Sequence, residues 1–307
     1  MKKTIFSLLL IFFSWSFFSC DRSAELDDQG IPKTLLIGTP GGNMAGLYGS
    51  ALEPLRKYLE KNLKRPVKFI LATDYTSVIE ALKAKKIHMA YLPPFAYVLA
   101  SQKMKMVPII TLGEGGKPAM YHSCIITNPQ SGINSIEDLK KNSKRLSICF
   151  PDPASTSGHL IPGAYLKSIG LNPETAFKAS IFSGDHVATI MSVASGKVDI
   201  GCTMTEMGVY RLEAMGQIKK ENVKILWISP PIVSDAIVMR SDINRDFDTQ
   251  VQKLYLNVKK EDPNAFNIFQ KFLNRDPAKL DFMVVQDSMY DGLRKIARDM
   301  NYLDAKK

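Results

Sequence analysis

Three hydroxyl-bearing residues stand in succession near the middle of the chain, at Ser155, Thr156 and Ser157. An apolar, strand-like run at 146–150 precedes them, and helical spacing of apolar residues follows from Leu160. The hydroxyls therefore fall on the N-cap and first turn of a predicted helix, where free backbone N–H groups point outward and the macrodipole is positive. Helix starts of this kind bind oxyanions. Because one hydroxyl is enough to cap a helix, three in a row favour a ligand site over capping alone.

Nucleophilic catalysis and metal binding find little support in the same stretch. It has no G-x-S-x-G elbow, and His159 follows Ser157 too closely to act as its base. The chain also lacks a G-x-x-x-x-G-K-[ST] phosphate loop, and none of its four histidines has H-x-H or H-E-x-x-H spacing. We therefore predict no metal, no cofactor and no enzymatic activity. An exported hydrolase that uses a serine and a histidine is the alternative from another class.

Length and composition indicate a globular protein of two domains. The chain has 307 residues, of which 45% are hydrophobic and 23% are charged, so it can bury two cores of ordinary size. The net charge is +10, but the lysines are spread along predicted helices, and no basic run is interleaved with aromatic residues. We expect no nucleic-acid partner and a mildly positive field that suits an anionic ligand.

Residues 1–20 form a predicted lipoprotein signal peptide. Two lysines precede an apolar run at 4–18 that is too short to span a bilayer comfortably. The run ends in a small residue followed by Cys20, which resembles a bacterial lipobox, where the cysteine is acylated after cleavage. We predict a lipid anchor at Cys20, a polar tether over 21–32, and a position on the periplasmic or cell-surface side of a bacterial membrane. The alternative is an ordinary signal peptide with an incidental cysteine.

The other cysteines are Cys124, Cys149 and Cys202, and each lies in an apolar run. No CxxC pair occurs, so buried free thiols are predicted rather than metal ligands or a disulfide framework. A single disulfide between two of them stays open.

Strand-like and helix-like segments alternate along the chain. Strands are predicted at 34–37, 67–71, 88–92, 107–112, 124–127, 146–150, 179–182, 198–202, 223–228 and 236–239. Helices are predicted at 55–62, 76–84, 95–102, 136–141, 158–169, 187–194 and 206–215, and the region after residue 240 is predicted to be mainly helical. The alternation favours an α/β fold with mostly parallel sheets.

One helix–strand unit occurs twice. The segment from Asp74 to Ala90 is matched without a gap, 111 residues further along, by the segment from Asp185 to Gly201. Each copy has an aspartate as the predicted N-cap, an amphipathic helix and an apolar strand, which favours two similar lobes over a chance likeness. Tyr75 and His186 hold the same position at the two helix starts, so both are expected to face one cleft between the lobes.

Several short sequences together resemble the phosphonate-binding proteins of ABC transporters, the PhnD-type family. They are DPASTSG at 152–158 with Pro-Gly at 162–163, Asp-Tyr at 74–75, Gly-Asp-His at 184–186, Ser-Pro-Pro-Ile at 229–232 and Asp-Ala-Ile-Val at 235–238. They occur in the family's order and spacing over residues 35–240. The chain departs from the family at 93–94, where Pro-Pro replaces the common Gly-Pro, and in the residues before Glu206.

The resemblance implies a type II-like periplasmic-binding-protein fold, in which two α/β lobes close on a ligand in the cleft between them. Lobe 1 would comprise residues 33–118 and 241–307, lobe 2 residues 122–230, and the hinge crossings would lie near 119–121 and 231–240.

The resemblance also assigns site residues. In the family, a hydroxyl triplet and a histidine hold the phosphonate oxygens, two tyrosines line the cleft, and carboxylates surround the amine of aminoalkyl phosphonates. These roles fall, in that order, on Ser155, Thr156, Ser157 and His186, on Tyr75 and Tyr121, and on Glu206 and Asp235. Taken singly, each has a structural explanation, such as a core aromatic residue for Tyr75 or a helix-dipole complement for Glu206.

The implied function is that of a monomeric solute-binding lipoprotein that captures a phosphonate-like oxyanion for an ABC permease and its ATPase. The carboxylates at Glu206 and Asp235 point to an aminoalkyl phosphonate, and phosphite or phosphate is the alternative ligand. A sensor or surface adhesin that uses the same fold is a further alternative.

Overall fold

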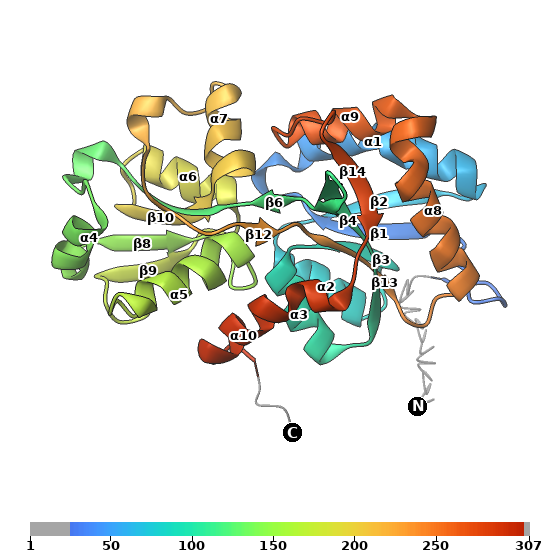
Figure 1. Cartoon of the computed structure of the whole chain (residues 1–307), viewed down its shortest axis with the longest axis horizontal. Helices are drawn as coiled ribbons and strands as arrows, with labels where there is room; N and C mark the ends of the chain where they lie inside the picture. The colour runs from blue at the N-terminus through green and yellow to red at the C-terminus, as the bar shows by residue number, and fades with distance from the viewer. Residues whose placement is uncertain (1–24, 304–307) are drawn as a thin grey trace, which may run out of the picture.

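The computed structural model describes residues 25–303, which form two α/β lobes lying side by side (Figure 1). The predicted signal peptide, Cys20 and residues 21–24 of the predicted tether lie outside the described residues. Each lobe is built on one mixed sheet with helices on both faces. We call the lobe with the larger sheet lobe 1 and the other lobe 2.

The lobe 1 sheet is buried on both faces. Its strands are β1 (Leu35–Pro40), β2 (Val67–Ala72), β3 (Met89–Leu92), β4 (Met106–Glu114), β5 (Lys117–Pro118), β13 (Ala236–Arg240) and β14 (Leu280–Val284). The order is β14-β4-β13-β3-β1-β2, with β5 paired to β4. Helices α1 (Ala45–Leu63), α8 (Arg245–Glu261) and α9 (Pro263–Phe272) pack into one apolar core, and α2 (Tyr75–Lys83), α3 (Pro94–Lys103) and α10 (Asp291–Asp299) pack into a second. Because one apolar core packs on each face of the sheet, the strand ends that face lobe 2 are held in fixed positions.

Lobe 2 repeats this layered arrangement on a smaller scale. Its strands are β7 (Ser123–Thr127), β8 (Ser147–Phe150), β9 (Ala179–Phe182), β10 (Ile200–Met204) and β11 (Lys224–Ile228), in the order β11-β7-β10-β8-β9. Its helices are α4 (Ile136–Asn142), α5 (Ile161–Ser168), α6 (His186–Ala194) and α7 (Arg211–Ala214). The central strands β7 and β10 are almost wholly buried, as expected for strands covered on both faces.

Two short strands connect the lobes. β6 (Met120–Tyr121) and β12 (Ile232–Val233) pair antiparallel and run between the two sheets (Figure 1). They lie in the segments that the sequence analysis assigns to the hinge. Tyr121 of β6 is buried, and its side chain lies in the region between the lobes.

The sheets are mixed, whereas the sequence predicts mostly parallel ones. Two of the six described strand pairs in lobe 1 and two of the four in lobe 2 are parallel. The cause in lobe 1 is β13, which returns from lobe 2 and enters antiparallel between β3 and β4. The C-terminal region, predicted as mainly helical, also contributes β14 at the sheet edge. Alternation of strands and helices cannot reveal the direction of a returning strand.

Two further expectations differ from the structure. Helix α1 begins ten residues before the predicted start at 55, because Pro54 lies inside the helix instead of marking its boundary. Residues 25–32, predicted as a tether, fold against lobe 1. The Asp27 carboxylate accepts hydrogen bonds from the backbone N–H groups of Gln29 and Ile31, and Leu26 and Ile31 pack on the lobe 1 core.

The repeated helix–strand unit is present in both lobes. Asp74 caps α2 by accepting a hydrogen bond from the Ser77 N–H at 2.7 Å, and Asp185 caps α6 by accepting one from the Ala188 N–H at 2.7 Å. Both helices have nine residues. Both helix starts therefore have the same geometry, and they face one another across the space between the lobes.

Cys124, Cys149 and Cys202 are free and buried, as predicted. Between residues 25 and 303 no helix has both the length and the apolar character needed to cross a bilayer.

Candidate ligand-binding site

A cavity of about 120 Å³ lies between the lobes. That volume has room for several water molecules or one small ligand. Its lining comes from both lobes: Thr39, Pro40, Gly41, Gly42, Met44, Tyr48, Thr73, Asp74, Tyr75, Tyr91, Pro93, Tyr121, Asp235 and Leu273, together with Ser155, Thr156, Ser157, Gly184, Asp185, His186, Val187, Met204, Met207 and Arg211. Seven of the eight predicted ligand-binding residues are among them.

The lobes touch directly around this cavity. The Asp185 carboxylate of lobe 2 accepts hydrogen bonds from the backbone N–H (2.8 Å) and side-chain amide (2.7 Å) of Asn43 in lobe 1. The Phe95 N–H at the start of α3 donates to the Thr156 hydroxyl at 2.8 Å. These contacts hold the two lobes against each other beside the cavity, so that a ligand inside would contact residues of both lobes.

Ser155 opens the helix predicted at this place and acts as its N-cap. Its hydroxyl oxygen accepts a hydrogen bond from the Gly158 N–H at 3.0 Å. The first turn, Thr156–Leu160, is a wide π-type turn that leads into α5; turns of this kind are common at functional sites. Gly158 is required here because a Cβ atom would lie 2.0 Å from Pro151 Cγ.

The three hydroxyls share one wall of the cavity. Ser155, Thr156 and Ser157 are each at most 2% exposed. The Tyr121 phenol approaches the hydroxyls of Thr156 and Ser157, so the hinge strand β6 contributes to the same wall. A phosphoryl oxygen placed here would meet hydroxyl donors, a phenol and the positive end of a helix dipole.

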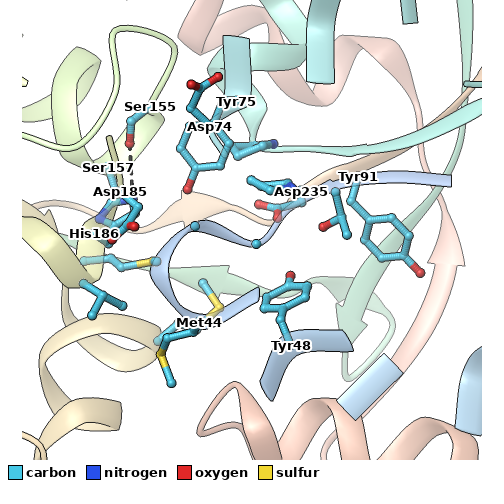
Figure 2. Close-up of a pocket in the computed structure, with 18 of the residues that line it drawn as sticks. Met44, Tyr48, Asp74, Tyr75, Tyr91, Ser155, Ser157, Asp185, His186 and Asp235 are labelled. Carbon is cyan, nitrogen blue, oxygen red and sulfur yellow. Dashed lines mark hydrogen bonds between the residues drawn. The ribbon is translucent and has the colours of Figure 1, made fainter. Parts of the chain in front are cut away.

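His186 stands beside this wall at the start of α6. Its Nε2 atom lies 3.3 Å from the Ser155 hydroxyl (Figure 2). Its Nδ1 atom lies 2.8 Å from the Thr203 hydroxyl. Burial, together with the positive charge of Arg211, lowers the pKa of His186 to about 3. The ring is therefore neutral, and it can donate one hydrogen bond toward the cavity.

This geometry does not make Ser155 a nucleophile. The hydroxyl already serves as a helix cap, and a histidine with so low a pKa is a poor base at neutral pH. The second ring nitrogen of His186 meets a hydroxyl, where a catalytic triad would place a carboxylate. His159 lies outside the cavity lining and stacks on Tyr302 with ring centroids 5.1 Å apart.

The opposite side of the cavity carries one carboxylate among tyrosines. Asp235 and Tyr48 lie across from Ser155, Ser157 and His186 (Figure 2). Burial raises the pKa of Asp235 to about 6, although the positive charge of Arg275 opposes that rise. Tyrosine faces beside a carboxylate can hold an ammonium group.

Tyr75 belongs to the wall between these two sides. Its ring meets the His186 ring edge-on, with centroids 6.4 Å apart. Its backbone N–H donates to the Asp152 carboxylate of lobe 2 at 3.2 Å. The residue therefore contacts lobe 2 through both its ring and its backbone, as the repeat predicts.

Glu206 is the predicted site residue that the structure does not bring to the cavity. Its carboxylate accepts hydrogen bonds from the Thr205 hydroxyl and from the His122 N–H, and it lies 2.7 Å from His122 Nδ1. The side chain is 35% exposed and absent from the cavity lining. The carboxylate is held by His122, which immediately precedes β7, and by Thr205, which immediately follows β10, so it does not face a ligand amine.

Several lining residues are not predicted from the sequence. Tyr48 follows the Thr-Pro-Gly-Gly sequence at 39–42, where a strand end and two glycines before a helix were the available signal. Met44, Met207 and Arg211 carry no local signal, because their place at the cavity depends on how the lobes meet. Within residues 25–303 no group of His, Cys, Asp and Glu side chains could hold a metal ion.

The two-lobed fold and the cavity between the lobes define a periplasmic-type substrate-binding protein. The comparison with known proteins agrees: the chain belongs to the family of periplasmic substrate-binding proteins of ABC phosphonate transporters, whose model matches residues 47–289. The predicted family and the predicted two-lobed fold are therefore confirmed.

Three similar proteins illustrate the relationship. The phosphate-import protein PhnD of Mycolicibacterium smegmatis is 28% identical over 289 residues, which are 90% of this chain and 88% of that protein. The phosphonates-binding periplasmic protein of Escherichia coli is 29% identical over 205 residues, 66% of this chain and 60% of that protein. The third is a crystal structure of a binding protein component of an ABC phosphonate transporter from Pseudomonas aeruginosa, which is 26% identical to this chain. The match covers 87% of this chain and 86% of that chain, with a TM-score of 0.76. Because these relatives are binding components of transporters, the prediction that the chain is not an enzyme is confirmed.

Proposed function

We propose that the chain captures a small phosphorus oxyanion and delivers it to an ABC permease and its ATPase. The observation that carries this proposal is the wall of Ser155, Thr156 and Ser157 at a helix start, buried inside the cavity between the lobes. A dianionic phosphonate or phosphate head needs many hydrogen-bond donors in a site that excludes water. His186 and Tyr121 add donors to the same wall.

The tail of the ligand is less closely specified than the head. Asp235 and the tyrosines opposite the hydroxyl wall support a small phosphonate, including one with an amine. Glu206 is engaged by His122, so of the two carboxylates that the resemblance assigns to the amine only that of Asp235 lines the cavity. Of the similar proteins named above, one is described as a phosphate-import protein and another as a phosphonates-binding protein, and phosphate and phosphonates share the head group that this wall would fit.

Binding would proceed by closure of the two lobes about β6 and β12. The predicted bounds change in one respect: β13 lies inside the lobe 1 sheet, so the second hinge crossing is shorter than the predicted 231–240. We assign residues 33–118 and 236–303 to lobe 1, residues 122–230 to lobe 2, and the segments near 119–121 and 231–235 to the hinge. The hydrogen bonds that Asn43 and Phe95 make to lobe 2 would form only on closure. A ligand that contacts both lobes therefore favours the closed form over the open one.

We further propose that Cys20 carries the lipid anchor and that the protein acts as a monomer on the outer side of the cell membrane. Replacing Cys20 with Ala should release the protein from membranes into the soluble fraction. A Cys20→Ala protein that stays membrane-bound would contradict the anchor. Light scattering of the soluble domain would detect any dimer.

The experiment that tests the ligand is isothermal titration calorimetry of the purified domain. The panel contains phosphate, phosphite, methylphosphonate, aminoethylphosphonate and methanesulfonate. We expect tight binding of at least one phosphorus oxyanion and weaker binding of the sulfonate. No detectable binding of any of the four phosphorus compounds would refute the proposal.

A further inference from the structure

Arg211 is a positively charged residue of lobe 2, and residues of lobe 1 cover its side chain. It begins α7, lines the cavity and is 8% exposed. A terminal nitrogen of its guanidinium donates to Met44 Sδ at 3.4 Å, and its Cζ atom lies 5.1 Å from the centre of the Phe272 ring. Both of these partners belong to lobe 1, so contact between the lobes buries this charge.

The Arg211 guanidinium forms no ion pair with a carboxylate of residues 25–303. Among residues 25–303, its Nε atom has no hydrogen-bond partner, and a thioether sulfur is only a weak acceptor. No carboxylate of the described chain lies within 4.0 Å of it. The carboxylate of Asp185 influences it from a distance but is held by Asn43 and by the Ala188 N–H.

Another buried arginine shows the usual arrangement. Arg240 is 4% exposed, and its guanidinium donates twice to the Asp242 carboxylate, at 2.9 Å each, and to the backbone carbonyl groups of Lys85 and Ile87. Burial of a charge is costly unless the charge is paired and hydrogen-bonded. Arg240 meets this condition within the protein, and Arg211 does not.

We propose that Arg211 is a ligand-binding residue whose missing counter-charge is the anion held in the cavity, so that the site selects ligands by charge. The proposal rests on the proposed function and specifies its ligand class as doubly charged oxyanions. Arg211 acts electrostatically on His186, which stands beside the hydroxyl wall, so its charge reaches the place proposed for the head group. The hydroxyls and the neutral ring supply hydrogen bonds to any tetrahedral oxyanion, and among the described residues that line the cavity Arg211 alone is an arginine or lysine.

The same arrangement links charge to closure. When the lobes close without an anion, Met44 and Phe272 cover an unpaired cation and remove its water. When an anion is present, the two opposite charges lie close together between the lobes, where they attract each other more strongly than in bulk water. A neutral residue at this position should therefore weaken anion binding and, at the same time, make closure of the empty protein easier.

The test compares two ligands of the same shape and different charge. Methylphosphonate, at a pH where it is a dianion, and methanesulfonate, a monoanion, are titrated into wild type, Arg211→Gln and Arg211→Lys. We expect Arg211→Gln to reduce the preference for methylphosphonate by about tenfold or more, which is what loss of a charge-assisted hydrogen bond produces, and Arg211→Lys to restore most of it. Arg294→Gln is the matched control, because Arg294 also lies over an aromatic ring, that of Tyr97 at 5.8 Å, but outside the cavity. An unchanged preference in Arg211→Gln, or an equal change in Arg294→Gln, would overturn the proposal.

A second measurement is independent of the ligand. Small-angle X-ray scattering of the ligand-free proteins should show Arg211→Met to be more compact than wild type, and equal dimensions would contradict the role in closure. If wild type bound no phosphorus oxyanion, the proposed function would fail, and the scattering comparison would still decide whether Arg211 opposes closure of the empty cavity.

Discussion

The Ser155→Ala substitution separates the two roles that the structure gives to the first hydroxyl of the wall. Ser155 caps the helix start through the Gly158 N–H, and it also faces the cavity beside His186. Removing an N-cap hydroxyl costs about 1 kcal/mol of stability. Removing a hydrogen bond to a charged ligand costs a further 1.5–3 kcal/mol, roughly, in binding free energy.

Ser135 offers a matched control in the same lobe. It caps α4 by accepting a hydrogen bond from the Asp138 N–H at 3.0 Å, the same length as the Ser155 cap, and it is absent from the cavity lining. Urea unfolding should therefore show a loss of about 1 kcal/mol in both Ser155→Ala and Ser135→Ala. Calorimetry with methylphosphonate should show about a 10- to 150-fold weaker affinity for Ser155→Ala alone.

Together, the two assays can refute the proposed contact between Ser155 and the ligand. If Ser155→Ala loses stability as Ser135→Ala does but binds every phosphorus oxyanion as tightly as wild type, the hydroxyl is a helix cap only. The reasoning from three consecutive hydroxyls to a ligand wall would then be wrong at its first residue.

Further substitutions test other parts of the site. Asp235 is mainly ionised only above its raised pKa of about 6. In wild type, the preference for aminoethylphosphonate over ethylphosphonate should therefore rise between pH 5 and 7, whereas in Asp235→Asn it should not change with pH. The same pH dependence in both proteins would show that Asp235 does not bind the amine. The same raised pKa means that, without ligand, the folded state binds more protons than the unfolded state. The free energy of unfolding should therefore decrease as the pH rises from about 4 to about 6. Urea unfolding should show a smaller decrease for Asp235→Asn than for wild type. Glu206→Gln should leave the preference between the two phosphonates unchanged, because Glu206 lies outside the cavity lining; a loss of affinity confined to the amine-bearing ligand would show that Glu206 contacts the amine. Gly158→Ala should cost about 1–3 kcal/mol in urea unfolding, because the new Cβ would lie 2.0 Å from Pro151 Cγ. Gly163→Ala, whose Cβ would meet no atom closer than 3.6 Å, should be neutral or stabilising, and equal losses in the two variants would reject the steric argument.

The parts of the site that depend on neighbouring residues in the sequence are predictable from it. Ser155 caps the turn that begins one residue later, and the aspartates at 74 and 185 cap their helices through N–H groups three residues away. Capping and dipole rules act over one helical turn, so the sequence contains all the information that these helix starts require.

Residues that act across the lobes are not predictable in this way. Arg211 is brought to Met44, 167 residues earlier, only by the meeting of the two lobes. Glu206 turns toward His122, 84 residues earlier, because the β7–β10 pairing places the two together. A charged residue in a first helical turn gives no sign of which of its possible partners the fold will supply.

The folded N-terminal segment has a mechanical consequence. The Lys33 N–H donates to the Glu25 carbonyl group, and Asn244 binds the carbonyl groups of Gln29 and Gly30, so the segment from residue 25 moves as one piece with lobe 1. If the chain is held to a surface ahead of residue 25, lobe 1 is the stationary part and lobe 2 swings toward it. A permease that contacts both lobes would then meet them in their matching arrangement only when the ligand is bound.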